Sequence, residues 1–265
     1  MEESNQMSFL QHLEELRWRL VKAAGAIVVF AGVAFFFKDI VFDKIILAPK
    51  DGDFITYKAF CKLGHLLGFE DRLCMGDVPI ILQNIDMSGQ FTTHLVVSLL
   101  AGIVISFPFV FYQVWGFVAP GLKTGEKSVA RGVVFFATFL FLSGVLFGYY
   151  IIAPLSVQFL GGYTVSDQVI NQISLSSYIT TVSTISVATG FIFQLPLVVY
   201  FLSKLGLVTP AFLKKYRRHA LVVVLILSAI ITPPDVTSQV LVAFPLLLLY
   251  EISILISKRV QKNKD

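Results

Sequence analysis

The chain has 265 residues, of which 56% are hydrophobic and 14% are charged, and its mean hydropathy is +0.78. This composition excludes a soluble globular domain and indicates a protein that crosses a membrane several times. The formal net charge of +4 reflects basic residues in the connections between apolar segments, so it indicates sidedness in a membrane and not nucleic-acid binding.

A mixed-charge segment, residues 1–22, precedes the first apolar stretch and predicts an amphipathic helix on the cytoplasmic side. At helical spacing Leu13 and Leu16 share an apolar stripe, and Glu15 and Arg19 line another. Two interpretations are open. The pair can be an i,i+4 ion pair on a solvated helix, or its carboxylate can face a ligand.

Six apolar stretches follow, and we interpret each as a transmembrane helix. The predicted fold is an all-α membrane protein with six transmembrane helices and both termini in the cytoplasm, forming one membrane domain. The predicted spans are residues 23–38, 91–115, 133–152, 178–202, 220–231 and 236–256. The predicted connections are an outer loop or cap at 39–90, a cytoplasmic loop at 116–132, an outer loop at 153–177, a cytoplasmic loop at 203–219, an outer turn at 232–235 and a cytoplasmic tail at 257–265.

Basic residues set the predicted orientation. With both termini cytoplasmic, most of the 21 lysines and arginines fall on the cytoplasmic side, and the others lie in or beside the long first outer loop. The positive-inside rule favours this arrangement over its inverse.

The last two helices are predicted to be short. The fifth stretch, residues 220–231, would extend only about 18 Å as a helix, against roughly 30 Å of hydrocarbon. Pro233 and Pro234 then turn the chain abruptly, because proline lacks an amide donor and biases its predecessor away from helix. We expect a locally thinned membrane beside this hairpin.

Two cysteines, Cys61 and Cys74, fall in the long outer loop and are the only ones in the chain. In an oxidising outer compartment they can pair as a disulfide. Two free thiols are the alternative.

The chain lacks the phosphate-binding motif G-x-x-x-x-G-K-[ST], the zinc motif H-E-x-x-H and the nucleophile motif G-x-S-x-G, and its four histidines are dispersed. We therefore expect no enzyme, no metal and no cofactor. A small-solute or ion transporter is the principal rival, but it predicts polar residues that converge at midplane, where Gln194 is the main one. Gln194 forms either an interhelical hydrogen bond or a functional polar site.

Five motifs, in order along the chain, resemble the TatC family, the polytopic core of the twin-arginine translocation system. They are FLQHLEELRWRL at 9–20, LAP at 47–49, YQVWGFVAPGLKTGEK at 112–127, FQLP at 193–196 and TPPDVTSQ at 232–239. The resemblance implies a receptor for twin-arginine signal peptides of folded cargo proteins in the bacterial cytoplasmic (inner) membrane. It also implies single-span partners of the TatA and TatB type, self-association in a larger complex, and the protonmotive force as the energy source.

The resemblance also implies site residues. The signal-peptide site corresponds to two carboxylates, two residues of the first cytoplasmic loop and two basic residues of the first motif: Glu15, Glu126, Phe117, Pro120, Arg17 and Arg19. Further family positions are an outer-loop proline, a residue inside the fourth span and the polar pair after the double proline: Pro49, Gln194, Asp235 and Gln239. Gln194 departs from the family, because many members have a glutamate there.

The chemistry of this assignment is consistent with the substrate. Two adjacent guanidinium groups need acceptors that they can bind bidentately, and carboxylates from two cytoplasmic segments supply them. We expect Glu15 to face the peptide, and Arg17, Arg19 and Lys22 to anchor the helix at anionic lipid.

Overall fold

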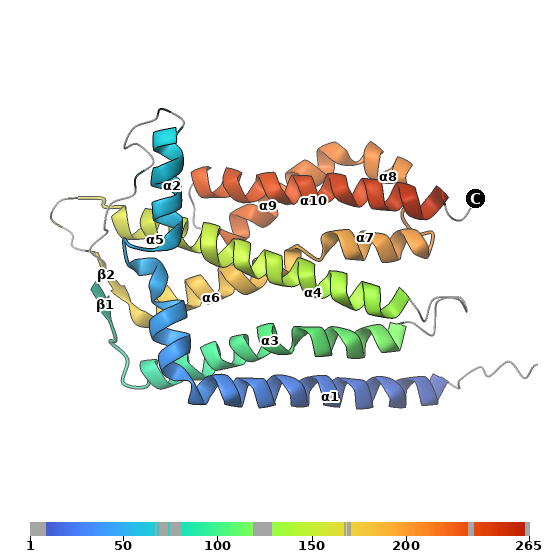
Figure 1. Ribbon diagram of the computed structural model, residues 1–265, viewed down its shortest axis with the longest axis horizontal. Helices are drawn as coiled ribbons and strands as arrows, with labels where there is room; N and C mark the ends of the chain where they lie inside the picture. The colour runs from blue at the N-terminus through green and yellow to red at the C-terminus, as the bar shows by residue number, and fades with distance from the viewer. Residues whose placement is uncertain are drawn as a thin grey trace, which may run out of the picture. The chain divides into compact units, whose positions relative to one another are not determined.

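The structure is a computed structural model that describes residues 9–66, 68, 74, 81–118, 129–166, 168, 171–232 and 236–262 (Figure 1). Over these residues it is almost entirely helical. Five of the described helical segments are long and apolar enough to cross a membrane: His12–Phe36, Gly89–Phe117, Gly132–Gly162, Leu175–Lys204 and Gln239–Lys262. The total of six spans and the cytoplasmic placement of both termini remain predictions.

The chain forms two compact units. The first comprises residues 1–37 and 95–139, and the second comprises residues 38–94 and 140–265. The first unit therefore holds helix α1 (Phe9–Phe36), most of α3 (Gly89–Val118) and the start of α4 (Val129–Phe147).

Helix α1 is one uninterrupted helix of 28 residues. The predicted amphipathic helix and the predicted first span are therefore continuous, because no proline separates them. Helix α3 lies directly against α1 at Gly102, where a Cβ would be 2.7 Å from both the amide nitrogen of Ala31 and the carbonyl oxygen of Ile27. The two backbones meet there only because Gly102 has no side chain.

The second unit contains the end of α4 and the remaining elements. They are the π-helix η1 (Ile40–Ile46), the 3-10 helix η2 (Ala48–Lys50), α2 (Ile55–Leu66), β1 (Ile81–Gln83), the π-helix η5 (Gly148–Ile152), α5 (Ala153–Gly162), β2 (Gln172–Ser174), α6 (Leu175–Ile192), α7 (Leu195–Lys204), α8 (Pro210–Lys215), α9 (Arg217–Ile231) and α10 (Val236–Lys262). Strands β1 and β2 pair in parallel, with Ile81 opposite Gln172.

Two apolar stretches differ from their predicted boundaries because of prolines. The helix of the third stretch continues through η5 and α5 to Gly162, beyond the predicted end at residue 152, because Pro154 lies in the first turn of α5, where no amide donor is needed. The fourth stretch is not one helix. It is broken at Phe193–Gln194, because Pro196 lies in the first turn of α7 and cannot continue the hydrogen bonds of α6.

The two final helices differ in length. Helix α9 has 15 residues and is short, as predicted. The prediction that the last helix is also short is wrong, because α10 has 27 residues. Its polar end, residues 257–262, contains Lys, Arg and Gln, which favour helix. Helix α10 packs along α7 and α9 (Figure 1). A buried hydrogen bond of 2.8 Å between the hydroxyls of Ser203 and Ser257 joins α7 to α10.

Helix α6 packs closely against η5 and the end of α4 through three glycines. A Cβ at Gly148 would lie 2.8 Å from the Cα of Ser186, and a Cβ at Gly144 would lie 2.8 Å from the carbonyl oxygen of Thr189. On the α6 side of this contact, a Cβ at Gly190 would lie 2.6 Å from a Val145 methyl carbon of α4. The contact therefore depends on small residues from both sides, as in close-packed membrane helices.

Buried tyrosines hold the irregular segment before α2. The Tyr57 hydroxyl lies 2.8 Å from the carbonyl oxygen of Pro49 and 3.1 Å from that of Pro154, so its proton is shared by two acceptors. Tyr178 donates to the carbonyl oxygen of Ile46 at 3.1 Å. Two of these acceptors, Pro49 and Ile46, lie in the 3-10 helix and the π-helix, so the tyrosines supply donors where the regular α-helical hydrogen bonds are interrupted.

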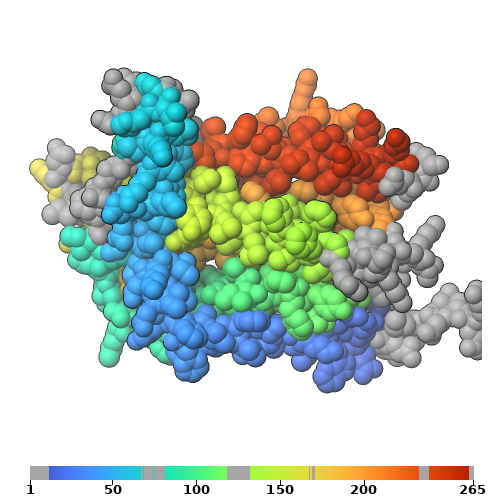
Figure 2. Space-filling model, in the orientation of Figure 1, coloured from blue at the N-terminus to red at the C-terminus, as the bar shows by residue number. Residues whose placement is uncertain are grey.

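Helix α2 lies beside η5 (Figures 1 and 2). The hydroxyl of Thr56 donates to the carbonyl of Tyr150. The ring of Phe54 stacks on that of Tyr150 with a centroid distance of 5.7 Å. Farther along, Cys61 of α2 is joined to Cys74 by a disulfide. The beginning of α2 is thus bound to the rest of the unit, and its later part is bound to the chain that follows it.

We expect Gly148→Ala to lower the free energy of unfolding by about 1–3 kcal/mol, because its methyl group would meet the backbone of α6, which cannot rotate away. Thermal unfolding of the detergent-solubilised protein measures this. Gly132→Ala, in the same helical segment Gly132–Gly162, is the control, since nothing lies within 4 Å of its Cβ position. It should leave stability unchanged or raise it by roughly 0.5–1 kcal/mol. Equal midpoints for the two variants would contradict the packing described.

Alkaline pH should weaken the attachment of α2. Burial raises the pKa of Tyr57 from 10.0 to about 12. Between these values the unfolded chain loses the phenol proton while the folded chain keeps it, so stability is complete below pH 10 and falls as pH rises toward 12. We expect this group to contribute roughly 1–3 kcal/mol of that loss.

The measurement is the unfolding midpoint of the parent, Tyr57→Phe and Tyr163→Phe across this pH range. Tyr57→Phe should be less stable near neutral pH and should show a shallower alkaline decline than the parent. Tyr163 is exposed, so Tyr163→Phe should follow the parent. A decline as steep in Tyr57→Phe as in the parent would contradict the assignment.

Candidate functional site

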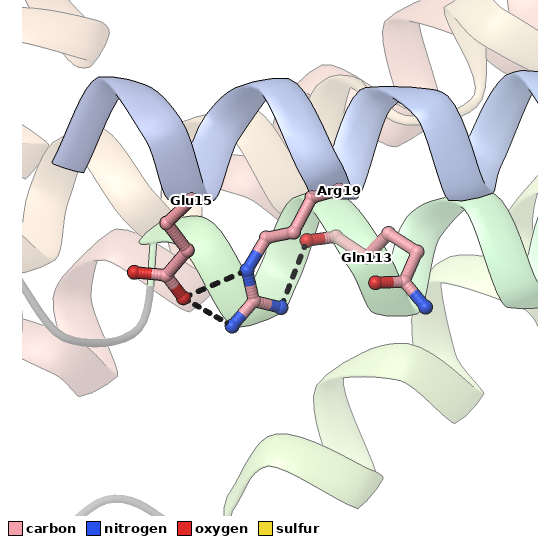
Figure 3. Close-up of polar contacts among 3 residues, drawn as sticks. All are labelled: Glu15, Arg19 and Gln113. Atoms are coloured by element: carbon pink, nitrogen blue, oxygen red, sulfur yellow. Dashed lines mark hydrogen bonds and ion pairs between the residues drawn. The ribbon is translucent and has the colours of Figure 1, made fainter. Parts of the chain in front are cut away.

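The predicted site residue Glu15 forms an ion pair with Arg19 on α1 (Figure 3). The Nε and Nη2 atoms of Arg19 both donate to Oε1 of Glu15, at 2.9 and 2.5 Å. The spacing i,i+4 places the two side chains on adjacent turns of one face. They are only 26% and 25% exposed, so this charge-assisted pair is more sheltered from water than an ordinary surface pair.

Arg19 also reaches α3. Its Nη1 atom lies 3.5 Å from the backbone carbonyl oxygen of Gln113 (Figure 3), and a helical carbonyl retains a second lone pair that can accept this bond. Gly116, nearby on α3, leaves the space for the guanidinium, because a Cβ there would lie 2.0 Å from Nη1. The Arg19 side chain is therefore fixed between a carboxylate and the backbone of a neighbouring helix.

In this structure the Arg19 guanidinium binds the carboxylate one turn earlier and the α3 carbonyl. The predicted role of Arg19 as a lipid anchor remains a prediction. Arg17 and Lys22 are exposed on α1, and their anchoring role remains a prediction.

Glu15 uses only one of its oxygens in these contacts. Within the described part of the chain no partner contacts Oε2, and Figure 3 shows this oxygen pointing away from Arg19. A carboxylate offers about four lone-pair positions, so Oε2 can accept a second cation while Oε1 stays bound to Arg19. The geometry thus gives an acceptor that is oriented in advance.

An aromatic contact lies one turn before Glu15. The rings of His12 on α1 and Phe117 on α3 stack with centroids 4.3 Å apart and an interplanar angle of 17°. The structure therefore brings Glu15, Arg19 and the predicted site residue Phe117 together at one end of the α1 and α3 pair. Glu14, by contrast, lies on the exposed face of α1.

Sequence reasoning missed the roles of Gln113 and Gly116. Gln113 contributes its backbone carbonyl, which no side-chain pattern reports, and Gly116 contributes empty space. Both lie within the YQVWGF part of a motif that carries the family resemblance, which was the available signal. Three predicted residues, Pro120, Glu126 and Asp235, lie outside the described residues.

The remaining predicted positions lie in the second unit. The buried Pro49 accepts the Tyr57 hydrogen bond. Gln194 lies at the break before α7, where its carbonyl accepts the amides of Leu197 and Val198. The side-chain amide of Gln239 donates to the carbonyl of Leu225 at 3.1 Å and so joins α10 to α9, a polar residue used for structure.

The sequence and the structure are similar to those of known proteins over nearly the whole chain. Residues 11–245 match the family described as "Sec-independent protein translocase protein (TatC)". The TatC protein of Blattabacterium sp. subsp. Periplaneta americana is 38% identical over 265 residues, covering 99% of each chain. The TatCy protein of Bacillus subtilis is 35% identical over 254 residues, covering 96% of this chain and 90% of that protein.

A solved structure is similar over almost the whole chain. The crystal structure of "Twin Arginine Translocase Receptor- TatC" is 33% identical, with a TM-score of 0.71, and the match covers 94% of this chain and 99% of that one. The same receptor crystallised in DDM gives a TM-score of 0.73. On this agreement of motifs, sequence and fold, the chain belongs to the TatC family and is a membrane component of a protein translocation system.

Proposed function

We propose that this protein is the signal-peptide receptor of a twin-arginine translocase that exports folded proteins. In this proposal Glu15 and Glu126 each bind one guanidinium of the arginine pair. The observation that carries it is the Glu15 carboxylate, which is partly buried, oriented by Arg19 and open at Oε2. A guanidinium presents two parallel N–H donors, which suits a carboxylate of fixed orientation.

Arg19 has two consequences for such a receptor. It holds the carboxylate in one orientation, which lowers the entropy lost on binding a peptide. It also neutralises part of the negative charge, so the site favours a ligand that brings a planar fork of donors over a diffuse cation. Phe117, fixed by His12, supplies an apolar surface beside this acceptor.

The wider assignment follows from family membership. We propose the bacterial inner membrane as the location, single-span TatA and TatB type subunits as partners, self-association in a larger complex, and the protonmotive force as the energy source. The absence of a phosphate-binding motif from the sequence is consistent with a system that does not hydrolyse nucleotide. The rival solute transporter has no comparable support in the family matches.

We expect Glu15→Gln and Glu126→Gln each to weaken binding of a twin-arginine peptide by roughly tenfold or more, because each removes a charge-assisted contact of about 1.5–3 kcal/mol. The measurement is titration of a fluorescent peptide against the detergent-solubilised protein. Glu126→Arg should bind more weakly than Glu126→Gln, since it adds repulsion to a lost acceptor.

Glu14→Gln is the matched control, because Glu14 neighbours Glu15 but lies on the exposed face of α1. It should bind like the parent. If Glu14→Gln weakens binding while Glu15→Gln and Glu126→Gln do not, the peptide is bound on another face of α1 and the assignment is wrong.

Replacing the arginine pair of the peptide by two lysines should also weaken binding to the unaltered protein. An ammonium group cannot reproduce the bidentate fork, although its charge is the same. Competition between the two peptides for the same receptor measures the difference. Equal affinities would show that the site recognises charge alone, and that the orientation of Glu15 by Arg19 has no role in selectivity.

A further inference from the structure

The loop cysteines and one histidine form a cluster that the proposed function does not use. The sulfurs of Cys61 and Cys74 and a ring nitrogen of His65 all lie within 4.8 Å of one another, the one such group of three or more potential metal ligands among the described residues. Cys61 and His65 are four residues apart on α2, so their side chains lie on the same face of the helix.

We propose that the reduced form of this cluster is a zinc site, with Cys61, His65 and Cys74 as protein ligands and water as the fourth ligand. Two thiolates and one imidazole are a donor set that Zn²⁺ accepts, and three protein ligands leave one coordination position open. The disulfide form, in which both sulfurs are bonded to each other, cannot supply the thiolates.

The position of His65 supports this inference. Its Nε2 atom lies 3.4 Å from the sulfur of Cys74 and 3.7 Å from that of Cys61. In a tetrahedral site with Zn–S near 2.3 Å and Zn–N near 2.0–2.1 Å, a sulfur and a nitrogen ligand are about 3.6 Å apart. His65 therefore already lies at ligand separation from both sulfurs, and only the two sulfurs must move apart.

The surroundings allow this movement. Thr56 and Tyr57 fix the first part of α2 through hydrogen bonds to Tyr150 and to Pro49 and Pro154, so the helix that carries two of the ligands stays in place. His65 is exposed, which gives the metal and its water access from solvent. Opening the disulfide removes no contact on which the start of α2 depends.

The reaction balances with a dithiol as the reductant. The dithiol passes two electrons and two protons to the disulfide, so its own sulfurs become a disulfide and Cys61 and Cys74 become thiols. Zn²⁺ then displaces one proton from each thiol and forms two Zn–S bonds and one Zn–N bond. Thiol–disulfide exchange with a small disulfide reverses the reaction: the two thiolates pass two electrons to that disulfide, whose sulfurs take up two protons and become thiols, while the Cys61–Cys74 bond forms again and Zn²⁺ is released.

The test uses the full chain in detergent, purified with an affinity tag that contains no histidine. The protein is reduced with a dithiol, which is then removed without oxygen, and Co²⁺ is added as a spectroscopic substitute for Zn²⁺. Because the chain has only two cysteines, any thiolate-to-cobalt charge-transfer absorption must come from Cys61 and Cys74. We expect absorption that saturates at one equivalent and is lost when Zn²⁺ is added, and no such absorption from the oxidised protein.

Variants separate the proposed site from binding by thiols alone. His65→Ala retains both cysteines and their disulfide, and it should weaken metal binding by tenfold or more. Cys61→Ser and Cys74→Ser should abolish the charge-transfer absorption at one equivalent. His219→Ala, an exposed histidine on α9, should bind like the parent. The proposal is wrong if the reduced parent shows no saturable absorption, or if His65→Ala binds with the affinity of the parent.

Discussion

The requirement that every buried backbone carbonyl find a donor shapes this protein wherever its helices are interrupted or meet. Inside a long helix the backbone meets this requirement by itself, but a buried segment outside regular α-helix needs donors from elsewhere. Tyr57 and Tyr178 donate to carbonyls of Pro49 and Ile46, in the 3-10 and π-helical segments, and Gln239 adds a donor to the carbonyl of Leu225 inside α9. Polar side chains, including Gln239, which the family resemblance marks, therefore stabilise the fold at several positions.

A backbone carbonyl is also an acceptor at the candidate site, but there it lies inside helix α3 and uses its second lone pair. Arg19 donates to the α3 backbone at Gln113, but the contact is long, and its shorter bonds go to Glu15. The guanidinium therefore connects the fold to the site: one end is held by a neighbouring helix and the other orients the carboxylate. An i,i+4 ion pair on a free helix would be worth only a few tenths of a kcal/mol and would fluctuate between rotamers. Here the guanidinium enters the space left by Gly116, and its contact with the Gln113 carbonyl on α3 restricts the ion pair.

The parts of the structure that depend on hydropathy could be predicted from the sequence, whereas those that depend on donors to backbone carbonyls could not. The apolar stretches predicted helices at the right places, because length and hydropathy suffice for that. From the sequence, an ion pair of Glu15 with Arg19 and a carboxylate facing a ligand are alternatives, but in the structure the pair uses Oε1 and leaves Oε2 open, so the two are compatible. That arrangement depends on Gly116, whose effect is the absence of atoms, and on a backbone carbonyl. Pro154 and Pro196 likewise both lie in the first turn of a helix. The helix of Pro154 follows directly on the π-helix η5, whereas the helix of Pro196 follows a break in the chain's helical hydrogen bonds, and the two prolines alone do not distinguish these cases. The length of α10 exceeds the predicted span because Lys, Arg and Gln prolong the helix beyond the apolar residues on which that prediction rests.

Helix α2 shows how two constraints on one short helix can remain independent. Thr56 and Tyr57 bind its first turn to η5 and to the segment around Pro49. Cys61 lies one turn later and constrains only the chain that follows. The hydrogen bonds of Thr56 and Tyr57 go to Tyr150, Pro49 and Pro154, which are not part of the sulfur cluster, so we expect a change at Cys61 and Cys74 to leave the start of α2 in place. A disulfide closing a loop of this size acts chiefly by limiting the unfolded chain, and a metal bound to the same residues would impose a similar limit. In the proposed zinc form the metal would replace the disulfide as the link between Cys61 and Cys74, and the redox state and metal supply outside the protein would set which form is present.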